Sequence, residues 1–449
     1  SNVGLIMHLN AKKRTLLIGC GAAGAISAIF GAPIGAVIFA IEVILLEIST
    51  ASFIPLLIAS VTGSITSMIL IGEESLFNFD LKEIFLAAHM PYYLILGIIC
   101  GMVSLYFSRM VRRTEKFMKD LGDQWMRILY GGAFLGFMVF FFPPIYGEGY
   151  ETLNTLIEGN SSEILDKSPF FSAIQNPAII LVFLSLIVLV KPIAAAVTIG
   201  AGGSGGIFAP SLYVGGIVGF LFAYSKNMLG FHIPLPIAHF TLVAMCGLMA
   251  GVQHAPLSAI FLIAEITGGY ELFVPLMFVS AISYITTTYF QKDSLYKLQL
   301  KDQGKHLPET KDEELLDTID ISQVIERDLL PVHPDAKLKN LIDLVKISKR
   351  NIFPVVDENL TLCGIITLDD FRHIMFDSEK QETVLVRQLM HSPPEILFST
   401  ENMQSAMEKF ERSGAWNLPV IENEKYQGFV SKSRIFNAYR KRLIRQKHD

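Results

Sequence analysis

A glycine-rich stretch, GAGGSGGIFAP from Gly200 to Pro210, has the residue types and spacing best suited to hold a ligand. Its five glycines in seven positions disfavour a continuous helix and favour a tight loop with converging backbone N–H groups. A helix that begins near Ile207 or Phe208 would direct its free N–H groups and the positive end of its dipole into this loop. Pro210 suits a first helical turn, where its missing N–H costs nothing. An anion is the ligand that such donors select.

Two other interpretations of this stretch are open. A phosphate-binding loop would require the pattern GxxxxGK[ST], which the sequence lacks, and no lysine follows the glycines. Glycines that let membrane helices pack closely are the structural alternative. In a bilayer, however, free N–H groups need a partner that lipid cannot supply. Their partial charges also bind an ion weakly enough to release it again.

Two acidic residues end matching apolar runs. GAPIGAVIFAIE ends at Glu42 and HAPLSAIFLIAE ends at Glu265, and each glutamate stands nine positions after a proline. Carboxylates inside a membrane indicate pore or ion sites by default, but the matched positions favour pairing with backbone N–H groups at a helix break. Lys191 is the only Lys or Arg in the segment 177–200 before the glycine loop. Three roles are open for Lys191: it raises the positive potential of an anion path, it extends its ammonium to the membrane surface, or it pairs with a carboxylate.

These residues belong to a chain of 449 residues that is 51% apolar and 18% charged. Most charged residues follow position 291, so the composition predicts a membrane part followed by a water-soluble part. Several apolar segments are shorter than about 20 residues and are broken by Gly or Pro, which is typical of discontinuous helices in transporters and channels. Plain helices packed through small residues are the alternative. The segments run at 14–30, 32–48, 52–71, 91–111, 126–145, 177–200, 205–224, 237–253, 255–268 and 272–290.

Basic residues predict the direction of threading, because they favour the cytoplasmic side of a membrane. One cluster runs from Lys12 to Arg14 and another from Arg109 to Lys119. Four apolar segments lie between these clusters and six more precede the charged tail, so the tail is predicted to be cytoplasmic. The segments 32–48 and 255–268 then cross in opposite directions, which is typical of an inverted-topology repeat.

The composition also argues against several classes of function. A net charge of −5, without a basic stripe interleaved with aromatics, argues against nucleic acid as a partner. The four cysteines form no CxxC pair and the histidines show no ligand spacing, so neither a disulfide framework nor a metal site is predicted. The sequence shows no recognisable pairing of a nucleophile with a base, so no enzyme activity is predicted.

The charged tail contains two similar units. The first has IFPVV at 352–356 and GIITLDD at 364–370, and the second has LPVI at 418–421 and GFVSKSR at 428–434. A helical stretch precedes each pair of strands, at Leu338–Lys349 and Met403–Ser413. This order predicts an α/β module made in duplicate.

Four stretches together closely resemble the CLC family of chloride channels and chloride/proton antiporters: GSGGIFAPSLYVGGIVG, GAPIGAVIFAIE, HAPLSAIFLIAEITGGYELFVP and SLYKLQL. The tail resembles the tandem CBS domains that many CLC proteins carry. The resemblance implies an α-helical polytopic membrane protein with a CLC-like inverted-topology repeat, followed by an α/β CBS domain pair. It implies a chloride-transport membrane domain at 1–300 that is incomplete at its N-terminus, a linker at 301–318, and CBS domains at 319–380 and 381–443.

The resemblance also implies a chloride site. The family's GxFxP loop supplies backbone amides to the ion, which places the site at Gly205, Gly206, Ile207 and Phe208. A tyrosine after the last membrane helix adds its hydroxyl, and Tyr296 matches it. A phenol O–H is a good neutral donor to a halide. The fluoride-exporting branch has a different residue there, so Tyr296 favours chloride; without the resemblance it would be a tyrosine of the membrane interface.

Two features of the resemblance bear on mechanism. The family's GSGIP loop and its GREGP loop with the gating glutamate are expected upstream, since Ser1–Asn10 resembles the end of the helix that follows GREGP. In coupled antiporters a glutamate one position after the Glu42 match relays protons, but this sequence has Val43. Valine cannot bind a proton and is typical of the channel branch, which favours passive conduction. Some antiporters lack this glutamate, so chloride/proton antiport is the alternative.

CBS pairs can bind adenine nucleotides, and the resemblance places ribose contacts on Thr367 and Asp370. In the second unit Ser431 matches the threonine, but Arg434 stands where the acid would be. One nucleotide site per pair is therefore expected, and no other cofactor is required. A dimerising tail without a ligand is the alternative.

These inferences together predict a homodimeric, multi-pass protein of the cell membrane that moves chloride through a pore in each subunit. Its CBS domains would be cytoplasmic and regulatory, and its partners would be chloride, the lipid bilayer and an adenine nucleotide. A CBS-containing divalent-cation transporter is the alternative from another class. It would need clustered acids near the midplane, where only Glu42, Glu265 and Glu271 are available.

Overall fold

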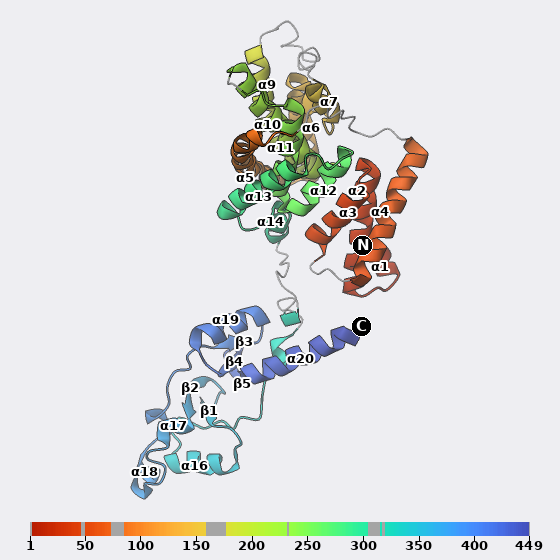
Figure 1. Ribbon diagram of the computed structural model, residues 1–449. Coiled ribbons are helices and arrows are strands. Elements are labelled where there is room, and N and C mark those ends of the chain that lie inside the picture. The colour runs from red at the N-terminus through yellow and green to blue at the C-terminus, as the bar shows by residue number, and fades with distance from the viewer. Residues whose placement is uncertain are drawn as a thin grey trace. The chain divides into compact units, whose positions relative to one another are not determined.

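The computed structural model describes residues 2–45, 50–72, 85–158, 177–230, 233–303, 315–316 and 319–448. The chain divides into two compact units, Ser1–Leu307 and Pro308–Asp449. The first unit is built of helices, and the second contains small sheets with shorter helices (Figure 1). The predicted linker at 301–318 falls mostly outside the described residues.

The first unit contains helices that can cross a bilayer. Within its described residues, seven helices are long and apolar enough to span a membrane. Three apolar helices are shorter than a span, as the sequence predicted: Pro33–Ile44, Ile237–Gln253 and Pro256–Ile266. The elements are α1 (Asn2–Ile6), α2 (Ala11–Phe30), α3 (Pro33–Phe39) with a π-helical turn (Ala40–Ile44), α4 (Thr50–Ile71), α5 (Met90–Asp120), α6 (Gln124–Phe141), α7 (Tyr150–Ile157), α9 (Pro177–Gly200), α10 (Phe208–Met228), α11 (Ile237–Gln253), α12 (Pro256–Ile266), α13 (Phe273–Phe290) and α14 (Leu295–Asp302).

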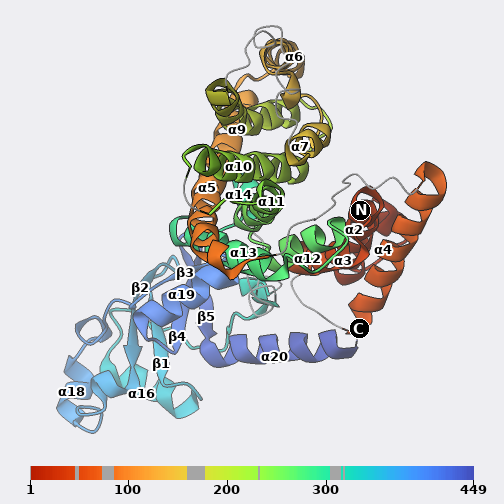
Figure 2. The same cartoon turned by 45° about the horizontal axis from the view of Figure 1, so that its top comes forward.

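The two copies of the sequence repeat form α3 and α12, which lie side by side (Figure 2). Each begins with a proline after an alanine, and the two alanines have similar backbone angles: φ −119° and ψ 75° at Ala32, φ −128° and ψ 69° at Ala255. The helices touch backbone to backbone, because a Cβ on Gly35 would lie 2.7 Å from the Leu262 Cα. The repeat in the sequence is therefore a repeat in the structure.

The centre of the first unit is the pair α10 and α11, which pack closely through glycines. A Cβ on Gly215 would lie 2.7 Å from the Ala244 carbonyl oxygen, and one on Gly219 would overlap the Phe240 carbonyl. Nearly every residue of α11 is buried, although this helix is too short for a full span. Small residues thus do permit close helix packing here, but within α10 rather than in the loop before it.

The second unit contains the predicted module in duplicate. Strands β1 and β2 form an antiparallel pair, whereas β3 is parallel to β4, and β4 is antiparallel to β5. A helix precedes each strand pair, as predicted, and the second one, α19, has the predicted bounds. The elements are α16 (Leu338–Ile347), β1 (Ile352–Val356), β2 (Leu362–Thr367), α17 (Leu368–Phe371), α18 (Ser378–Thr383), β3 (Leu397–Phe398), α19 (Met403–Ser413), β4 (Asn417–Glu422), β5 (Lys425–Ser431) and α20 (Lys432–His448).

Backbone hydrogen bonds join the two modules of the tail. Glu326, near the start of the first module, forms an antiparallel bridge with Phe429 on β5, with N···O distances of 2.7 and 3.0 Å. His391, near the start of the second module, forms the equivalent bridge with Ile365 on β2, at 2.9 and 3.0 Å. Each module therefore completes the sheet of the other, which explains why the two repeats form one compact unit.

Candidate anion site

The candidate site begins at the N-terminal end of α10. This helix starts at Phe208, as the sequence predicted, and Ile207 is its N-cap residue, with φ −93° and ψ −10°. Among the described residues, no side chain caps this end, and the first helical hydrogen bond runs from the Ser211 N–H to the Ile207 carbonyl at 3.0 Å. The backbone N–H groups before Ser211 thus have no partner inside the helix. They form a neutral donor group at the positive end of a 21-residue helix.

The glycines of the loop before α10 do not pack helices together. A Cβ on Gly206 would meet nothing within 4 Å, and one on Gly205 would make only ordinary contacts of 3.6 Å or more. Gly202 has φ +93°, a left-handed conformation that favours glycine. Two glycines of the predicted stretch do make close contacts: an added Cβ on Gly203 would lie 2.9 Å from the Thr198 carbonyl oxygen, and one on Gly200, at the end of α9, would lie 2.7 Å from the Met118 Cβ of α5. The alternative that these glycines mediate close packing therefore fails at Gly205 and Gly206.

A cavity of about 730 Å³ adjoins the start of α10. Its wall includes the loop and the first residues of the helix, Gly205, Gly206 and Phe208, and also Lys191 of α9. Thr198 at the end of α9 and Ser204 of the loop also line it, and Phe30, Ile145, Glu148 and Tyr150 come from elements distant in the sequence. The structure thus brings four of the predicted site residues to one cavity.

Lys191 is a buried cation at this cavity. Its side chain is 3% exposed, and its ammonium donates hydrogen bonds to the Ile145 and Gly147 carbonyl oxygens, both at 2.7 Å. The ammonium also lies 4.8 Å from the centre of the Tyr213 ring, a favourable cation–π geometry. The snorkelling interpretation is therefore wrong, and the hydrogen bonds of this lysine go to carbonyls rather than to a carboxylate. Because it lines the cavity, Lys191 raises the positive potential there.

Ile207 and Tyr296 do not line this cavity. Ile207 is 2% exposed and belongs to the apolar core of the first unit. Tyr296, at the start of α14, packs against the same core. Phe208 packs its ring against those of Phe30 and Phe39, with centroids 5.4 and 5.5 Å away. The ring contacts fix the side chain of Phe208 and leave its backbone N–H as the group that can serve an anion.

Glu42 and Glu265 bind each other's helices. The Glu265 carboxylate accepts hydrogen bonds from the backbone N–H groups of Ile34 (3.0 Å) and Gly35 (2.7 Å) at the start of α3. The Glu42 carboxylate caps the start of α12 in the same way, as its hydrogen bonds with Leu257 (3.2 Å) and Ser258 (2.7 and 2.5 Å) show. This arrangement requires antiparallel helices, as the threading predicted. The two glutamates therefore pair with backbone N–H groups, as predicted from their matched positions.

Val43 follows Glu42 in the π-helical turn after α3. Its side chain is half-buried and packs against the core of the first unit. No titratable atom exists at this position, so a proton path through it would have no carrier.

The tail has a polar cavity of about 530 Å³ between its two modules. Thr367, at the end of β2, lines it, as do the bases Lys349, Arg350 and Arg372 and the ring of Trp416. The Arg350 guanidinium bonds Asp328 at 3.0 Å and Glu326 at 2.5 Å, and these partners raise the pKa of Arg350. The remaining lining residues are Leu329, Asn351, Ile352, Ile365, Leu368, Asp369, His391, Pro394, Ala415 and Asn417.

Two of the predicted nucleotide contacts are not on this wall. Asp370 caps α17, since its carboxylate accepts from the Thr367 N–H (2.6 Å) and hydroxyl (2.7 Å) and also lies 3.2 Å from the His391 imidazole. The neighbouring Asp369 lines the cavity instead. Ser431 is 5% exposed and donates to the Glu326 carboxylate at 2.7 Å. Among the residues that the structure describes, no group of three His, Cys, Asp or Glu side chains is placed to hold a metal.

Sequence reasoning missed the far wall of the anion cavity. Ile145, Gly147, Glu148 and Tyr150 come from a loop and helix more than 40 residues before Lys191. The GEGY pattern at 147–150 follows two prolines but matches no binding motif. No local signal identifies these residues, because only the tertiary fold brings them to the cavity.

Long apolar helices, an antiparallel helix repeat with an uncapped helix start nearby, and a duplicated α/β tail define a multi-pass membrane protein with a water-soluble domain. Residues 2–288 match the family described as voltage gated chloride channel. Residues 321–377 and 386–441 match the CBS domain. The chain therefore belongs to the voltage gated chloride channel (CLC) family, whose members are channels and transporters, and its CBS domains follow the membrane part on the cytoplasmic side.

The chain is similar to curated proteins and to solved structures. A ClcB-like chloride channel protein of Ralstonia nicotianae is 28% identical over 292 residues, which cover 65% of this chain and 64% of that protein. Chloride channel protein CLC-f of Arabidopsis thaliana is 32% identical over 292 residues, 61% of this chain and 35% of that protein. The crystal structure of a slow cyanobacterial Cl⁻/H⁺ antiporter has the same fold, with a TM-score of 0.51, 21% identity and 67% of each chain covered. The chain thus spans less than two thirds of either curated relative.

Proposed function

We propose that the membrane part conducts chloride past the start of α10. Backbone N–H groups, rather than formal cations, bind the ion there. The observation that carries this proposal is the contrast among three helix starts. A glutamate carboxylate caps α3 and another caps α12, whereas none of the side chains that the structure describes caps α10. The uncapped donors adjoin a cavity, where an exchangeable anion can take the place that a carboxylate holds elsewhere.

The cavity also has the electrostatics that anion transit requires. Lys191 attracts anions, but its two carbonyl partners and the nearby Glu148 moderate its charge. A neutral set of N–H donors binds a halide without an ion pair, so the ion can leave quickly. Gly205, Gly206, Ile207 and Phe208 supply the donors in this proposal, and the Tyr296 hydroxyl adds one from α14. Sequence resemblance supports the assignment of Tyr296.

Passive conduction is the mode that Val43 favours, because valine offers no site for a proton. The alternative is chloride/proton antiport, the activity for which the slow cyanobacterial antiporter of the same fold is named. Purified protein in liposomes with a chloride gradient separates the two. Passive conduction predicts chloride efflux that needs a potassium shunt and moves no protons. Efflux that drives protons uphill would establish antiport and contradict the passive mode, while no flux in either assay would contradict chloride transport.

Replacing single amides with esters tests the proposed donors directly, because this change removes one N–H and keeps the side chain. An ester at Phe208 should weaken chloride binding about fivefold to tenfold, since a neutral hydrogen bond contributes about 1 kcal/mol. Leu212 offers a matched control, because an ester there removes an N–H in the second turn of the same helix. Equal chloride affinity in the two esters would exclude the start of α10 as the binding group. Bromide soaked into crystals should then also give no anomalous peak there.

The tail is a second candidate site, for an adenine nucleotide. Lys349 and Arg372 offer charges for phosphates, the exposed Trp416 ring offers a surface for stacking, and the Thr367 hydroxyl is placed for a ribose. The cavity lies between the modules, which supports one nucleotide per pair. Titration calorimetry with ATP and AMP should show binding that the double change Lys349→Gln and Arg372→Gln weakens. Lys346→Gln, on an exposed lysine outside the cavity, serves as the control.

Two further expectations have a direct test. A divalent-cation transporter would use Glu42 and Glu265 as ligands, but both carboxylates already accept backbone hydrogen bonds. Uptake of ⁵⁴Mn²⁺ into the same liposomes would revive that alternative. The proposed homodimer rests on the family resemblance, and light scattering of the protein in detergent should give twice the mass of one chain.

A further inference from the structure

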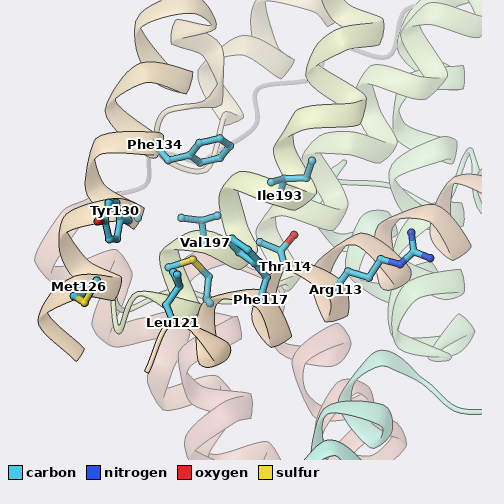
Figure 3. A pocket seen from close by; sticks show the side chains of 11 residues that line it. Arg113, Thr114, Phe117, Leu121, Met126, Tyr130, Phe134, Ile193 and Val197 are labelled. Carbon is cyan, nitrogen blue, oxygen red and sulfur yellow. The ribbon is translucent and has the colours of Figure 1, made fainter. Parts of the chain in front are cut away.

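An apolar cavity of about 800 Å³ opens between α5, α6 and α9. Figure 3 shows Tyr130 and Phe134 of α6 on one side of it and Ile193 and Val197 of α9 on the other. Arg113 extends from one end of the cavity. The other lining residues are Thr114, Phe117, Met118, Leu121, Met126 and Gly131. All three helices are candidate membrane spans, and the α5 residues that line this cavity belong to the charged end of that helix.

The exposed fractions of the side chains that line the cavity show that it is open at the surface of the first unit. Phe117 is 63% exposed and Tyr130 is 54% exposed, although both are large apolar rings. Gly131 leaves room in the wall where α6 packs closely, because a Cβ on it would lie 2.8 Å from the Ala201 Cβ. A groove with an apolar floor and exposed apolar walls accommodates a hydrocarbon chain.

A second cavity, of about 490 Å³, is lined by the charged end of α5 and by Asp302 of α14. Arg113 lines both cavities, so the charged one adjoins the apolar one at this residue. The bases are Arg109, Arg112, Arg113, Lys116 and Lys119, and the acids are Glu115 and Asp302.

Both acids in the charged cavity already have partners. Asp302 receives two hydrogen bonds from the Arg112 guanidinium, at 3.0 and 2.9 Å. Glu115 accepts from the Gln299 amide at 2.7 Å. Five bases against two acids leave a positive excess beside the opening of an apolar groove. The same cluster marks the cytoplasmic side of the membrane, where anionic lipids attract basic residues.

We propose that these two cavities form one site for an anionic phospholipid of the cytoplasmic leaflet. One acyl chain occupies the groove between α6 and α9, and the phosphate lies against Arg113 and Lys116. Charge complementarity and the apolar groove select this occupant together: a soluble phosphate would not use the groove, and a neutral lipid would not use the bases. The site involves neither the start of α10 nor the tail, so it is independent of the proposed chloride path.

Native mass spectrometry of the full chain in neutral detergent tests the proposal, with phosphatidylglycerol and phosphatidylcholine of equal chain length as probes. Phosphatidylglycerol should bind preferentially. Each basic side chain near a membrane surface contributes about 1 kcal/mol, so Arg113→Gln should weaken its binding about fivefold. The double change with Lys116→Gln should weaken it about 25-fold. Lys13→Gln, on an exposed lysine at the same predicted side of the membrane, should leave it unchanged.

The groove has its own test, which needs no variant. Phosphatidylglycerols with progressively longer acyl chains should bind the unaltered protein progressively more tightly until the groove is filled, because each methylene that enters it adds van der Waals contacts with the walls. Ile193→Trp should fill the groove and flatten this dependence, while Ile193→Val should preserve it. Equal binding of phosphatidylcholine, a Lys13→Gln effect as large as that of Arg113→Gln, or no dependence on chain length would each overturn the proposal. Competition by glycerophosphoglycerol without acyl chains would show a soluble-anion site instead.

Discussion

Replacing Glu265 with glutamine tests whether carboxylates hold the repeated helices together. Its two oxygens accept from the Ile34 and Gly35 N–H groups, which are the free donors at the start of α3. Glutamine keeps the length of the side chain but offers one oxygen and one NH₂ group. One backbone donor therefore faces another donor, and the remaining hydrogen bond loses its charge assistance.

The cost of this change can be worked from the hydrogen bonds. A hydrogen bond to a charged group contributes about 1.5–3 kcal/mol, and a neutral one about 0.5–1.5 kcal/mol. Losing one charged bond and converting the other to a neutral one gives about 2.5–4.5 kcal/mol of destabilisation for Glu265→Gln. No water is at hand in a bilayer to satisfy the stranded N–H group, so the upper part of this range is expected.

The pseudo-symmetric change Glu42→Gln should have a similar effect. Its oxygen can keep accepting from Ser258 while the NH₂ group faces Leu257, whose bond is the longest at 3.2 Å. The two caps lie at opposite ends of α12, roughly 10 Å apart by the 1.5 Å helical rise per residue. At that separation, without shared partners, the two effects should add in the double variant within about 0.5 kcal/mol.

Equilibrium unfolding in mixed SDS micelles, followed by circular dichroism, measures these differences. Glu271→Gln is the matched control, because this glutamate is exposed near the end of α12 and caps neither α3 nor α12. The control should stay within about 0.5 kcal/mol of the parent protein. If Glu265→Gln and Glu271→Gln unfold at the same SDS fraction, the Glu265 carboxylate contributes nothing to the pairing of the helices, and the reasoning from reciprocal caps is refuted.

Two further changes test the packing and the electrostatics. Gly35→Ala places a methyl group 2.7 Å from the Leu262 backbone and should destabilise the membrane part by about 2 kcal/mol or more. Gly21→Ala, whose added methyl meets nothing within 4 Å, should instead stabilise α2 by up to about 1 kcal/mol. The same unfolding assay compares the two variants, and equal effects would contradict the close contact at Gly35. In the tail, hydrogen bonds from Lys339 and Lys337 lower the pKa of Glu382 from 4.5 to about 2. The stabilising contribution of the Glu382 carboxylate is therefore present above about pH 4.5 and lost as the pH falls towards 2. Glu382→Gln should lower the thermal midpoint of the tail at pH 7 and not at pH 2. A difference in thermal midpoint that does not change with pH would exclude this ion pair as the cause.

Local patterns predicted much of the fold. The start of α10 at Phe208 follows from glycines that end one helix and a proline that suits the first turn of the next. The bounds of α19 follow from its Asn402 cap and from Gly414 in a left-handed conformation. The two glutamate caps followed from a repeat that the sequence displays directly. Each of these signals lies within a few residues of the feature it predicts.

Contacts between distant segments could not be predicted in this way. The carbonyl partners of Lys191 lie 44 and 46 residues before it, and no pattern in the sequence connects them. The bridges that Glu326 and His391 form with the opposite CBS module also join segments that no local pattern connects. Asp370 illustrates the consequence: the motif assigns it to a ribose, but its carboxylate caps α17 and meets His391, while Asp369 faces the cavity.

The three helix starts α3, α10 and α12 connect stability with conduction. Each begins after a break and presents free N–H groups, which lipid cannot satisfy. Carboxylates satisfy α3 and α12, and because Glu42 and Glu265 belong to the chain itself, these caps cannot leave without unfolding the pair. A third carboxylate at α10 would compete with any anion for the same donors. Changing Ser204, which lines the cavity beside them, to Asp should therefore stabilise the start of α10 and abolish chloride flux, whereas Ser204→Asn should preserve the flux.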